Sequence, residues 1–291
     1  MILSDYHLHS EFSGDSIQNI DELILKAISM GIEEIAITDH LEYDMEGITG
    51  KWILDLESYT QKIGIMKEKY RKDIEIKLGV EVGIQPHTKK YLEEKIKKYP
   101  FDFVIASSHA INGKDISFGE IHKGKTKDEI QTMYFENVLK NVEVYEEYNV
   151  YGHLDFITRY GGDASKGLNY EIQRDIIDEI LKKIISKGKG IEINTSGYRY
   201  REDRFYPHIK VLNRYFELGG EIITVGSDAH KKEDVAKDFD IVYDFLRNAG
   251  KKYICSFYCF SHTYFPLRIS NWICSGENIS LQMVGLFKCP I

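Results

Sequence analysis

The sequence predicts an α/β fold in which about seven parallel strands, each followed by a helix, close into a barrel. Short apolar segments alternate with longer amphipathic segments along the first 254 residues, as in parallel sheets with helical crossovers. No glycine-rich dinucleotide fingerprint follows the first apolar segment, which disfavours an open Rossmann-type sheet. The chain of 291 residues is long enough for one large barrel, and no internal repeat or low-complexity linker divides the first 254.

The expected strands are short apolar segments, and the expected helices lie between them. The strands are Ile2–Leu8, Glu34–Thr38, Ile74–Val82, Phe101–Ser107, Val150–Phe156, Gly190–Asn194 and Glu221–Gly226. The first helix begins after Asn19, an N-cap residue with Glu22 at the capping-box position, and it ends at Gly31. The other helices are Asp55–Tyr70, Asp128–Tyr148, Glu171–Gly188, Pro207–Leu218 and Glu233–Asn248. Pro207 fits the first turn of its helix, because that position needs no backbone donor.

Composition and charge exclude several classes of protein. The chain is 43% apolar and 29% charged, which is ordinary for a globular domain. A net charge of -8 disfavours nucleic acid as a partner. No run of about 18 apolar residues predicts a membrane span, and no basic segment followed by an apolar one predicts a signal peptide. We therefore expect a cytoplasmic protein without a membrane partner.

The last part of the chain differs from the rest. All four cysteines lie after residue 254, without a CxxC pair, so neither a cysteine zinc site nor a disulfide framework is expected. Residues 256–291 carry only Arg268, Glu277 and Lys288 as charges. This stretch is either an extra packed segment or a sequence appended to a domain that ends near Phe257. We favour the second interpretation, with a barrel over 1–257 and an atypical apolar tail over 258–291.

Polar side chains stand at or just after the end of every predicted strand. They are His7, His9, Asp15, Asp39, His40, Glu81, His109, His153, Asn194, Arg199, Asp228 and His230. Barrels of this class build their active sites at the carboxyl ends of their strands. Each motif alone is better explained by a turn or a surface position, although a lone carboxylate such as Glu81 in an apolar strand is costly to bury. Their coincidence with successive strand ends favours a single site.

The chemistry of this set indicates metal ions. Six imidazoles and three carboxylates (Asp15, Glu81 and Asp228) offer nine nitrogen or oxygen ligands without a thiolate, which suits Zn, Mn or Fe. One ion needs fewer ligands, so a cluster of two or three divalent ions is expected. Such a cluster generates hydroxide near neutral pH and clamps the oxygens around phosphorus. Arg159 and Arg199 follow the fifth and sixth strands, where guanidinium groups suit phosphate oxygens.

The order and spacing of six motifs resemble those of the polymerase-and-histidinol-phosphatase (PHP) superfamily, and most closely its monofunctional histidinol-phosphatase branch. The motifs are Asp5-x-His7-x-His9, Thr38-Asp39-His40, Gly79-Val80-Glu81, Ser107-Ser108-His109, Gly152-His153-Leu154-Asp155 and Gly226-Ser227-Asp228-Ala229-His230. The resemblance runs from Met1 to about Phe257, and the remaining residues match nothing in the family. It implies a distorted (β/α)7 TIM-like barrel with a trinuclear metal site.

The resemblance also implies a role for each site residue. One metal would be held by His7, His9, Glu81 and Asp228. Glu81 would bridge to a second metal, held also by His109 and His153. The third metal would be held by Asp15, His40 and His230, and relatives carry either His or Asp at the position of Asp15. Arg159 and Arg199 would bind the substrate phosphate.

The function implied is hydrolysis of L-histidinol phosphate to L-histidinol and phosphate, a late step of histidine biosynthesis. A metal-bridging hydroxide would attack phosphorus in line, with Glu81 as the bridging ligand and Asp228 or His230 protonating the leaving group. One alternative is another PHP phosphoesterase: a phosphotyrosine-protein phosphatase, a nuclease or a nucleotide phosphatase. Another is a metal-dependent binding module that has lost catalysis, which the complete ligand set disfavours. The native metal and the oligomeric state remain open.

Overall fold

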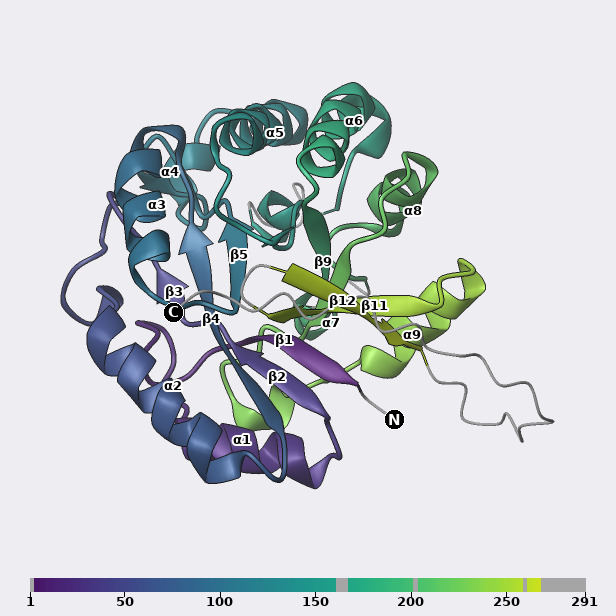
Figure 1. The fold of residues 1–291 in the computed structure, drawn as a ribbon. Coiled ribbons are helices and arrows are strands. Elements are labelled where there is room, and N and C mark those ends of the chain that lie inside the picture. The colour runs from purple at the N-terminus through teal and green to yellow at the C-terminus, as the bar shows by residue number, and fades with distance from the viewer. Residues whose placement is uncertain (1–2, 161–166, 201–203, 259–260, 268–291) are drawn as a thin grey trace.

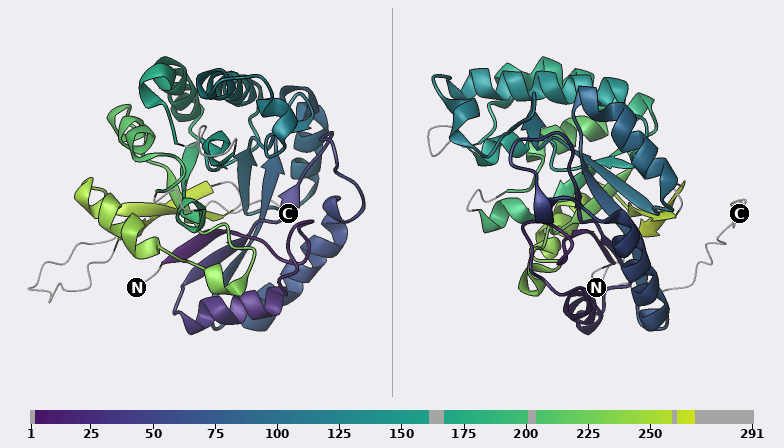
Figure 2. Two further views of the ribbon diagram at one scale, coloured as in Figure 1. Left: turned by 180° about the vertical axis from the view of Figure 1, so that it is seen from behind. Right: turned by 90° about the vertical axis from the view of Figure 1, so that its left-hand side faces the viewer.

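The computed structural model describes residues 3–160, 167–200, 204–258 and 261–267, and its centre is a parallel barrel ringed by helices (Figures 1 and 2). The strands follow one another around the barrel in the order β1 (Ser4–Leu8), β2 (Glu34–Ile37), β4 (Glu75–Gly83), β5 (Phe103–Ser107), β8 (Val150–Tyr151), β9 (Gly190–Asn194) and β10 (Ile223–Gly226). The short strand β3 (His40–Leu41) also pairs with β4. A parallel bridge between Leu8 and Ala229, in which the His9 amide donates to the Ala229 carbonyl at 3.0 Å, brings the two edges of the sheet together. The predicted seven-stranded barrel is confirmed.

The helices alternate with the strands, and the long ones pack around the outside of the barrel (Figure 2). The helices are α1 (Ile20–Ser29), α2 (Leu56–Tyr70), α3 (Lys89–Lys98), α4 (Gly119–His122), α5 (Lys127–Val144), α6 (Tyr170–Ser186), α7 (Ser196–Arg199), α8 (Ile209–Glu217) and α9 (Phe239–Asn248). Helix α1 begins as predicted, because the Asn19 side chain accepts hydrogen bonds from the Asp21 and Glu22 amides. It ends before Gly31, whose φ of 68° suits glycine. Helix α3 has few apolar residues among its charges and was not predicted.

Short 3-10 helices and one small hairpin complete the described elements. The 3-10 helices are η1 (Gly50–Trp52), η2 (Pro86–Thr88), η3 (Phe156–Arg159) and η4 (Lys232–Asp234). Strands β6 (Ala110–Ile111) and β7 (Lys114–Asp115) pair antiparallel after β5. This hairpin and the segments that contain η1 and η3 contribute side chains to the cavity described below.

Four predicted boundaries were wrong, two of them because a residue distant in the sequence supplies a hydrogen bond that interrupts the repeat. Strand β8 ends at Tyr151, and His153 lies in the loop beyond it, where its amide donates to the Glu192 carboxylate at 3.0 Å instead of to a strand. Helix α9 begins at Phe239 and not near residue 233, because the Ala236 amide donates to Asp5 at 2.9 Å. Pro207 lies before the N-cap residue of α8, His208, and not in its first turn. Helix α5 ends at Val144, a few residues earlier than expected.

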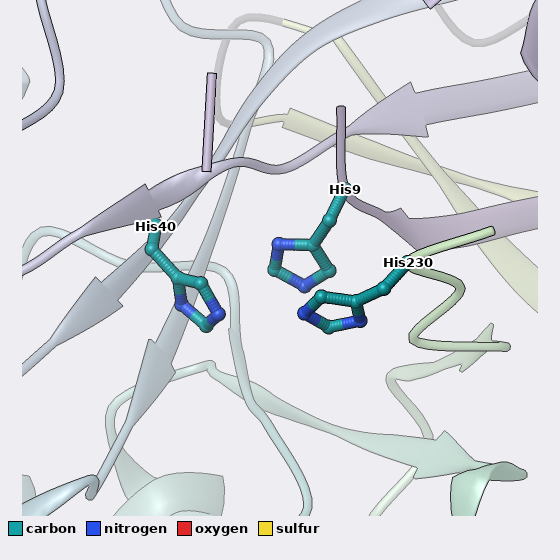
Figure 3. Close-up of side chains that lie close together, drawn as sticks. All are labelled: His9, His40 and His230. Atoms are coloured by element: carbon teal, nitrogen blue, oxygen red, sulfur yellow. The ribbon is translucent and has the colours of Figure 1, made fainter. Parts of the chain in front are cut away.

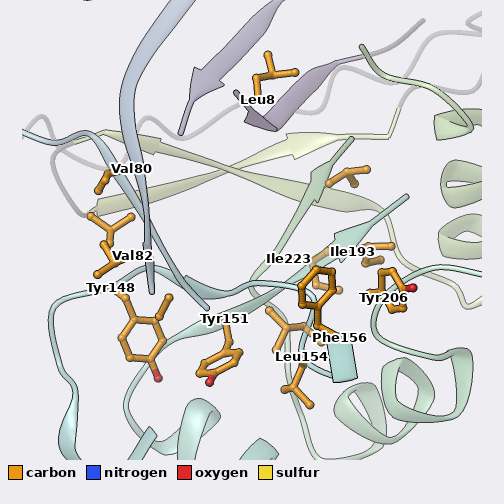
Figure 4. Packing of buried hydrophobic residues seen from close by; sticks show 14 of the residues in the cluster. Leu8, Val80, Val82, Tyr148, Tyr151, Leu154, Phe156, Ile193, Tyr206 and Ile223 are labelled. Carbon is orange, nitrogen blue, oxygen red and sulfur yellow. The ribbon is translucent and has the colours of Figure 1, made fainter. Parts of the chain in front are cut away.

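A large apolar cluster fills the space between strands and helices. Leu8, Val80, Val82 and Tyr151 belong to it and are almost completely buried (Figure 4). Each fully buried side chain of this kind stabilises the fold by about 1.5–3 kcal/mol relative to an exposed one. The cluster holds the strands firmly, so the loops at their carboxyl ends stand on a rigid base.

A hairpin of β11 (Tyr253–Tyr258) and β12 (Ser261–Pro266) lies against the end of the barrel where the strands begin. Cys255 and Phe257 of β11 pack in a second apolar cluster with Phe103 and Val150, the first residues of β5 and β8. The predicted tail, 258–291, therefore starts inside this hairpin. Residues 268–291 lie outside the described residues, and the domain boundary at 257 stays a prediction. Within the described part of the chain, no helix is both long and apolar enough to cross a membrane.

Candidate metal centre

The Glu81 carboxylate lies at the middle of the polar residues that the strand ends bring together. It is completely buried on β4, and five imidazoles surround it. Its Oε2 lies 3.2 Å from His7 Nε2, 3.5 Å from His9 Nε2 and 3.0 Å from His40 Nδ1. Its Oε1 lies 3.2 Å from His109 Nε2 and 2.9 Å from His153 Nε2. One carboxylate thus connects residues at or just beyond the carboxyl ends of β1, β2, β5 and β8.

Asp228 and Asp15 lie on the other side of the histidines. Asp228 Oδ1 is 3.4 Å from His9 Nε2 and 3.5 Å from His230 Nδ1. Asp15 Oδ2 is 3.0 Å from His230 Nε2 and 3.5 Å from His40 Nε2. Figure 3 shows the rings of His9, His40 and His230 close together, and those of His9 and His230 are stacked with centroids 4.1 Å apart. The structure therefore brings all nine predicted ligands into one cluster.

Several atoms of the cluster fit a metal because they are buried with unused lone pairs. His7 Nε2, His9 Nε2 and Glu81 Oε2 have no hydrogen-bond partner among the described residues. Leaving a polar atom buried and unpaired costs about 1–3 kcal/mol, which a bound cation would recover. His7, His9 and Glu81 also offer ligand atoms within 4.8 Å of one another, as do Glu81, His109 and His153. The second group is the set predicted for the second metal, and the first contains three of the four ligands predicted for the first metal, without Asp228.

Two further groups of this kind differ from the prediction. One consists of His40, Glu42 and His109, and the other of His9, His40 and His230. Asp15, the predicted third ligand, is not part of either group, although its carboxylate contacts both His40 and His230. Its side chain is 36% exposed, whereas those of the other two carboxylates are almost buried. The assignment of Asp15 to a metal stays a prediction.

The pKa values of the clustered carboxylates and histidines show how bound cations would change their protonation. Burial alone would raise the pKa of Glu81 and of Asp228, but the neighbouring imidazoles hold both pKa values well below the usual range. Burial alone would lower the pKa of His109, but Glu42 and Glu81 raise it to about 10. Burial and the neighbouring His230 and His40 lower the pKa of His9 to about 3. Divalent cations would satisfy the same carboxylates and displace the protons, since a histidine must be neutral to bind metal.

Two buried carboxylates, Glu192 and Glu42, were missed by the sequence analysis. Glu192 Oε1 lies 2.6 Å from Nδ1 of His7, and Glu42 Oε1 lies 2.5 Å from Nδ1 of His109. Glu192 carried a usable signal, because it is a lone carboxylate within the apolar strand β9 (Gly190–Asn194), as Glu81 is within β4. Glu42 follows His40 in a loop-like segment, and no sequence pattern distinguished it from a surface residue.

A cavity of about 390 Å³ opens over the cluster. Its floor contains Asp15, His40, Glu81, His109, His153, Asp228 and His230, and its walls contain Glu42, Met45, Trp52, Asp115, Ile116, Ser117, Phe156, Arg159, Tyr160 and Tyr200. The Arg159 guanidinium lies over the Tyr200 ring, with its Cζ atom 3.1 Å from the ring centroid, so a cation–π contact holds it at the cavity wall.

The two arginines predicted to bind phosphate are placed differently. Arg159 lines the cavity, whereas Arg199 is not among the described residues that do. Arg199 Nη2 donates to the Asp228 carbonyl at 2.7 Å, and its Nε lies 3.8 Å from Asp234. Arg199 Nη1 is buried and has no hydrogen-bond partner among the described residues. Contact between Arg199 and phosphate stays a prediction.

Comparison with known sequences gives consistent relatives. A family model described as PHP domain matches residues 5–196. The histidinol-phosphatase of Lactococcus lactis is 37% identical over 228 residues, which cover 78% of this chain and 83% of that protein. A probable histidinol-phosphatase of Clostridium acetobutylicum is 33% identical over 253 residues, which cover 85% of this chain and 94% of that protein.

Comparison with solved structures supports the barrel. The crystal structure of histidinol phosphate phosphatase from Lactococcus lactis, complexed with Zn, L-histidinol and phosphate, matches with a TM-score of 0.83 and 34% identity. The match covers 90% of this chain and 98% of that chain. A putative histidinol phosphatase from Listeria monocytogenes matches with a TM-score of 0.71 at 22% identity over 82% of this chain and 99% of its own, which supports the fold alone.

Proposed function

Since the chain belongs to the PHP domain family and to its histidinol-phosphatase branch, we propose that it hydrolyses L-histidinol phosphate to L-histidinol and inorganic phosphate. The observation that carries the proposal is the cluster of nine nitrogen and oxygen ligands, in which five imidazoles contact Glu81, beneath a cavity that also contains an arginine. A volume of about 390 Å³ lies within the range of small-molecule sites. The cytoplasmic location expected from the sequence stays a prediction.

The cofactors that the residues fit are two or three divalent ions, with Zn as the leading candidate because the related Lactococcus lactis structure contains it. They would be held by His7, His9, Asp15, His40, Glu81, His109, His153, Asp228 and His230. When bound, such ions lower the pKa of water toward neutrality and neutralise charge on phosphoryl oxygens.

The chain's own residues then bind the substrate and move its protons. The Arg159 guanidinium, held against Tyr200, offers paired N–H donors to the phosphoryl oxygens. Asp228 and His230 both line the cavity and are the candidates for protonating the leaving alkoxide. His230 suits this role better, because Asp15 and Asp228 outweigh burial and raise its pKa, whereas the pKa of Asp228 is held low. The cavity wall also carries Asp115, whose carboxylate suits the positively charged amino group of L-histidinol.

The test is steady-state phosphate release from L-histidinol phosphate, with Zn²⁺, Mn²⁺ or Fe²⁺ and with a chelator. O-phosphotyrosine and short oligonucleotides serve as competing substrates. We expect the highest kcat/KM for L-histidinol phosphate and loss of activity with chelator. Absence of phosphate release with every metal would overturn the proposal, and well under one metal per chain would instead indicate a binding module that has lost catalysis.

A further inference from the structure

Glu192 is a buried carboxylate next to the proposed metal centre that the proposed reaction does not use. It lies in the middle of β9 and is 1% exposed, and it is not among the described residues that line the cavity. Its Oε2 accepts hydrogen bonds from the His153 amide at 3.0 Å and from Asn194 Nδ2 at 3.2 Å. Its Oε1 lies 2.6 Å from His7 Nδ1. Every close partner of this carboxylate is therefore a donor or a ring nitrogen that can donate.

The backbone leaves space for this carboxylate. A Cβ atom at Gly226 would overlap both Glu192 Oε1 and the Cβ of His7, and a Cβ at Gly152 would lie 3.4 Å from Glu192 Oε2. Glycine at these positions lets β8 and β10 approach β9 on either side of the Glu192 side chain. The glycines next to β9 therefore leave the space that the contact between Glu192 and His7 requires.

The hydrogen bonds determine where His7 carries its proton. An ionised carboxylate only accepts, so in the neutral ring Nδ1 of His7 donates to Glu192 and the lone pair lies on Nε2. Nε2 has no hydrogen-bond partner among the described residues, and it faces Glu81 Oε2 at 3.2 Å and Asp228 Oδ1 at 3.8 Å. A carboxylate behind a histidine ring commonly orients that ring toward a metal.

We propose that Glu192 is a positioning residue that keeps the proton of His7 on Nδ1 and so directs the Nε2 lone pair at the metal. The proposal rests on the metal centre of the proposed function and adds a residue outside its ligands. Glu42 contacts Nδ1 of His109 in the same way. Glu42 also lines the cavity and could itself bind a metal, so a substitution of Glu192 tests the positioning role with less ambiguity.

The first experiment compares Glu192→Gln with the wild type. The two donors at Oε2 favour the amide oxygen there, which turns the amide NH₂ toward His7 Nδ1 and forces the ring proton onto Nε2. We expect Zn²⁺ affinity, measured by competition with a chromophoric chelator, to fall about 10–100-fold. Glu192→Asp keeps the charge but is one methylene shorter, so we expect a smaller loss of affinity.

The matched control is Glu34→Gln, a buried carboxylate at the opposite end of the barrel. We expect it to lower the thermal midpoint of the chelator-treated protein and to keep wild-type Zn²⁺ affinity. Wild-type affinity in a folded Glu192→Gln protein would overturn the proposal. An equal loss of affinity in Glu34→Gln would overturn it as well, since the effect would then be general.

The second experiment needs no variant. Long-range ¹H–¹⁵N spectra of the Zn²⁺-loaded wild type, in which a metal-bound His7 ring is neutral, report whether Nδ1 of that ring carries hydrogen. We expect a protonated Nδ1, and an unprotonated Nδ1 would overturn the proposal. Neither experiment uses the substrate, so metal affinity lost in Glu192→Gln without any hydrolysis of L-histidinol phosphate would refute the proposed function and leave the role of Glu192 intact.

Discussion

The two ends of the barrel both bury charged side chains, but they differ in how completely the buried polar atoms are hydrogen-bonded. Where the strands begin, Glu34 pairs with Lys77 Nζ at 3.1 Å and accepts hydrogen bonds from Ser256 Oγ at 3.0 Å and from the Tyr6 hydroxyl. The Tyr6 oxygen in turn accepts from the Phe257 amide at 2.9 Å. Polar groups that serve only the fold are normally paired in this way.

Where the strands end, buried groups remain unpaired. His7 Nε2, His9 Nε2 and Glu81 Oε2 have no hydrogen-bond partner among the described residues. Tyr6 and His7 are neighbours in β1, yet one joins the paired network and the other joins the unpaired cluster. Burial of a polar residue alone therefore does not identify a functional site. A cluster of buried metal-ligating side chains with unused lone pairs does, because a bound cation then recovers the cost of desolvation.

The largest effect is expected from a substitution at the carboxyl ends of the strands, where the unpaired groups lie. Glu81→Ala removes the carboxylate that contacts five imidazoles, and we expect loss of at least one metal per chain. We expect kcat/KM to fall by more than the 10–100-fold typical of residues that only orient a ligand. Phosphate release and metal analysis measure both effects, and a variant with full activity and full metal content would contradict the assignment of Glu81.

The next effect concerns the cavity wall. Arg159→Ala removes a charged donor to phosphate, and a hydrogen bond to a charged group contributes about 1.5–3 kcal/mol. We therefore expect kcat/KM for L-histidinol phosphate to fall about 10–150-fold, with metal content unchanged. Steady-state kinetics beside metal analysis check this. Equal kinetics in the variant and the wild type would show that Arg159 does not contact the substrate.

Metal removal should destabilise the protein moderately. Ions that bind only the folded chain stabilise it by about 2.7 kcal/mol at a hundred times their Kd. For a chain of this size, we expect chelator treatment to lower Tm by about 5–10 °C, and added Zn²⁺ to restore both Tm and activity. Calorimetry with and without chelator provides the measurement. An unchanged Tm would mean that the unpaired groups are satisfied without metal.

The smallest effect is expected from a substitution where the strands begin, in the hydrogen-bonded network around Glu34. Tyr6→Phe leaves the Phe257 amide without its acceptor and removes one donor from Glu34. We expect the free energy of unfolding to fall by about 1–3 kcal/mol, while kcat/KM and metal content stay at wild-type values. Urea unfolding and phosphate release test this together. A loss of metal in this variant would show that the two ends are coupled.

The fold was largely predictable from local patterns. Strand β9 (Gly190–Asn194) was predicted to the residue, and Asn19 and Gly31 mark the two ends of α1 as expected. The early end of β8 and the late start of α9 were not predictable. Each depends on a carboxylate distant in the sequence, Glu192 for the His153 amide and Asp5 for the Ala236 amide.

The sequence by itself determined which residues stand at the strand ends, because apolar periodicity places the strands and parallel strands share one carboxyl edge. That was enough to group six histidines with Asp15, Glu81 and Asp228. Only the tertiary structure decided which carboxylates face the cavity and which stand behind a ring, as Glu192 stands behind His7. It also placed Arg159 on the cavity wall and Arg199 against the Asp228 carbonyl. The physical reason is that strand position sets where a side chain begins, whereas its partners are set by contacts between strands far apart in the chain.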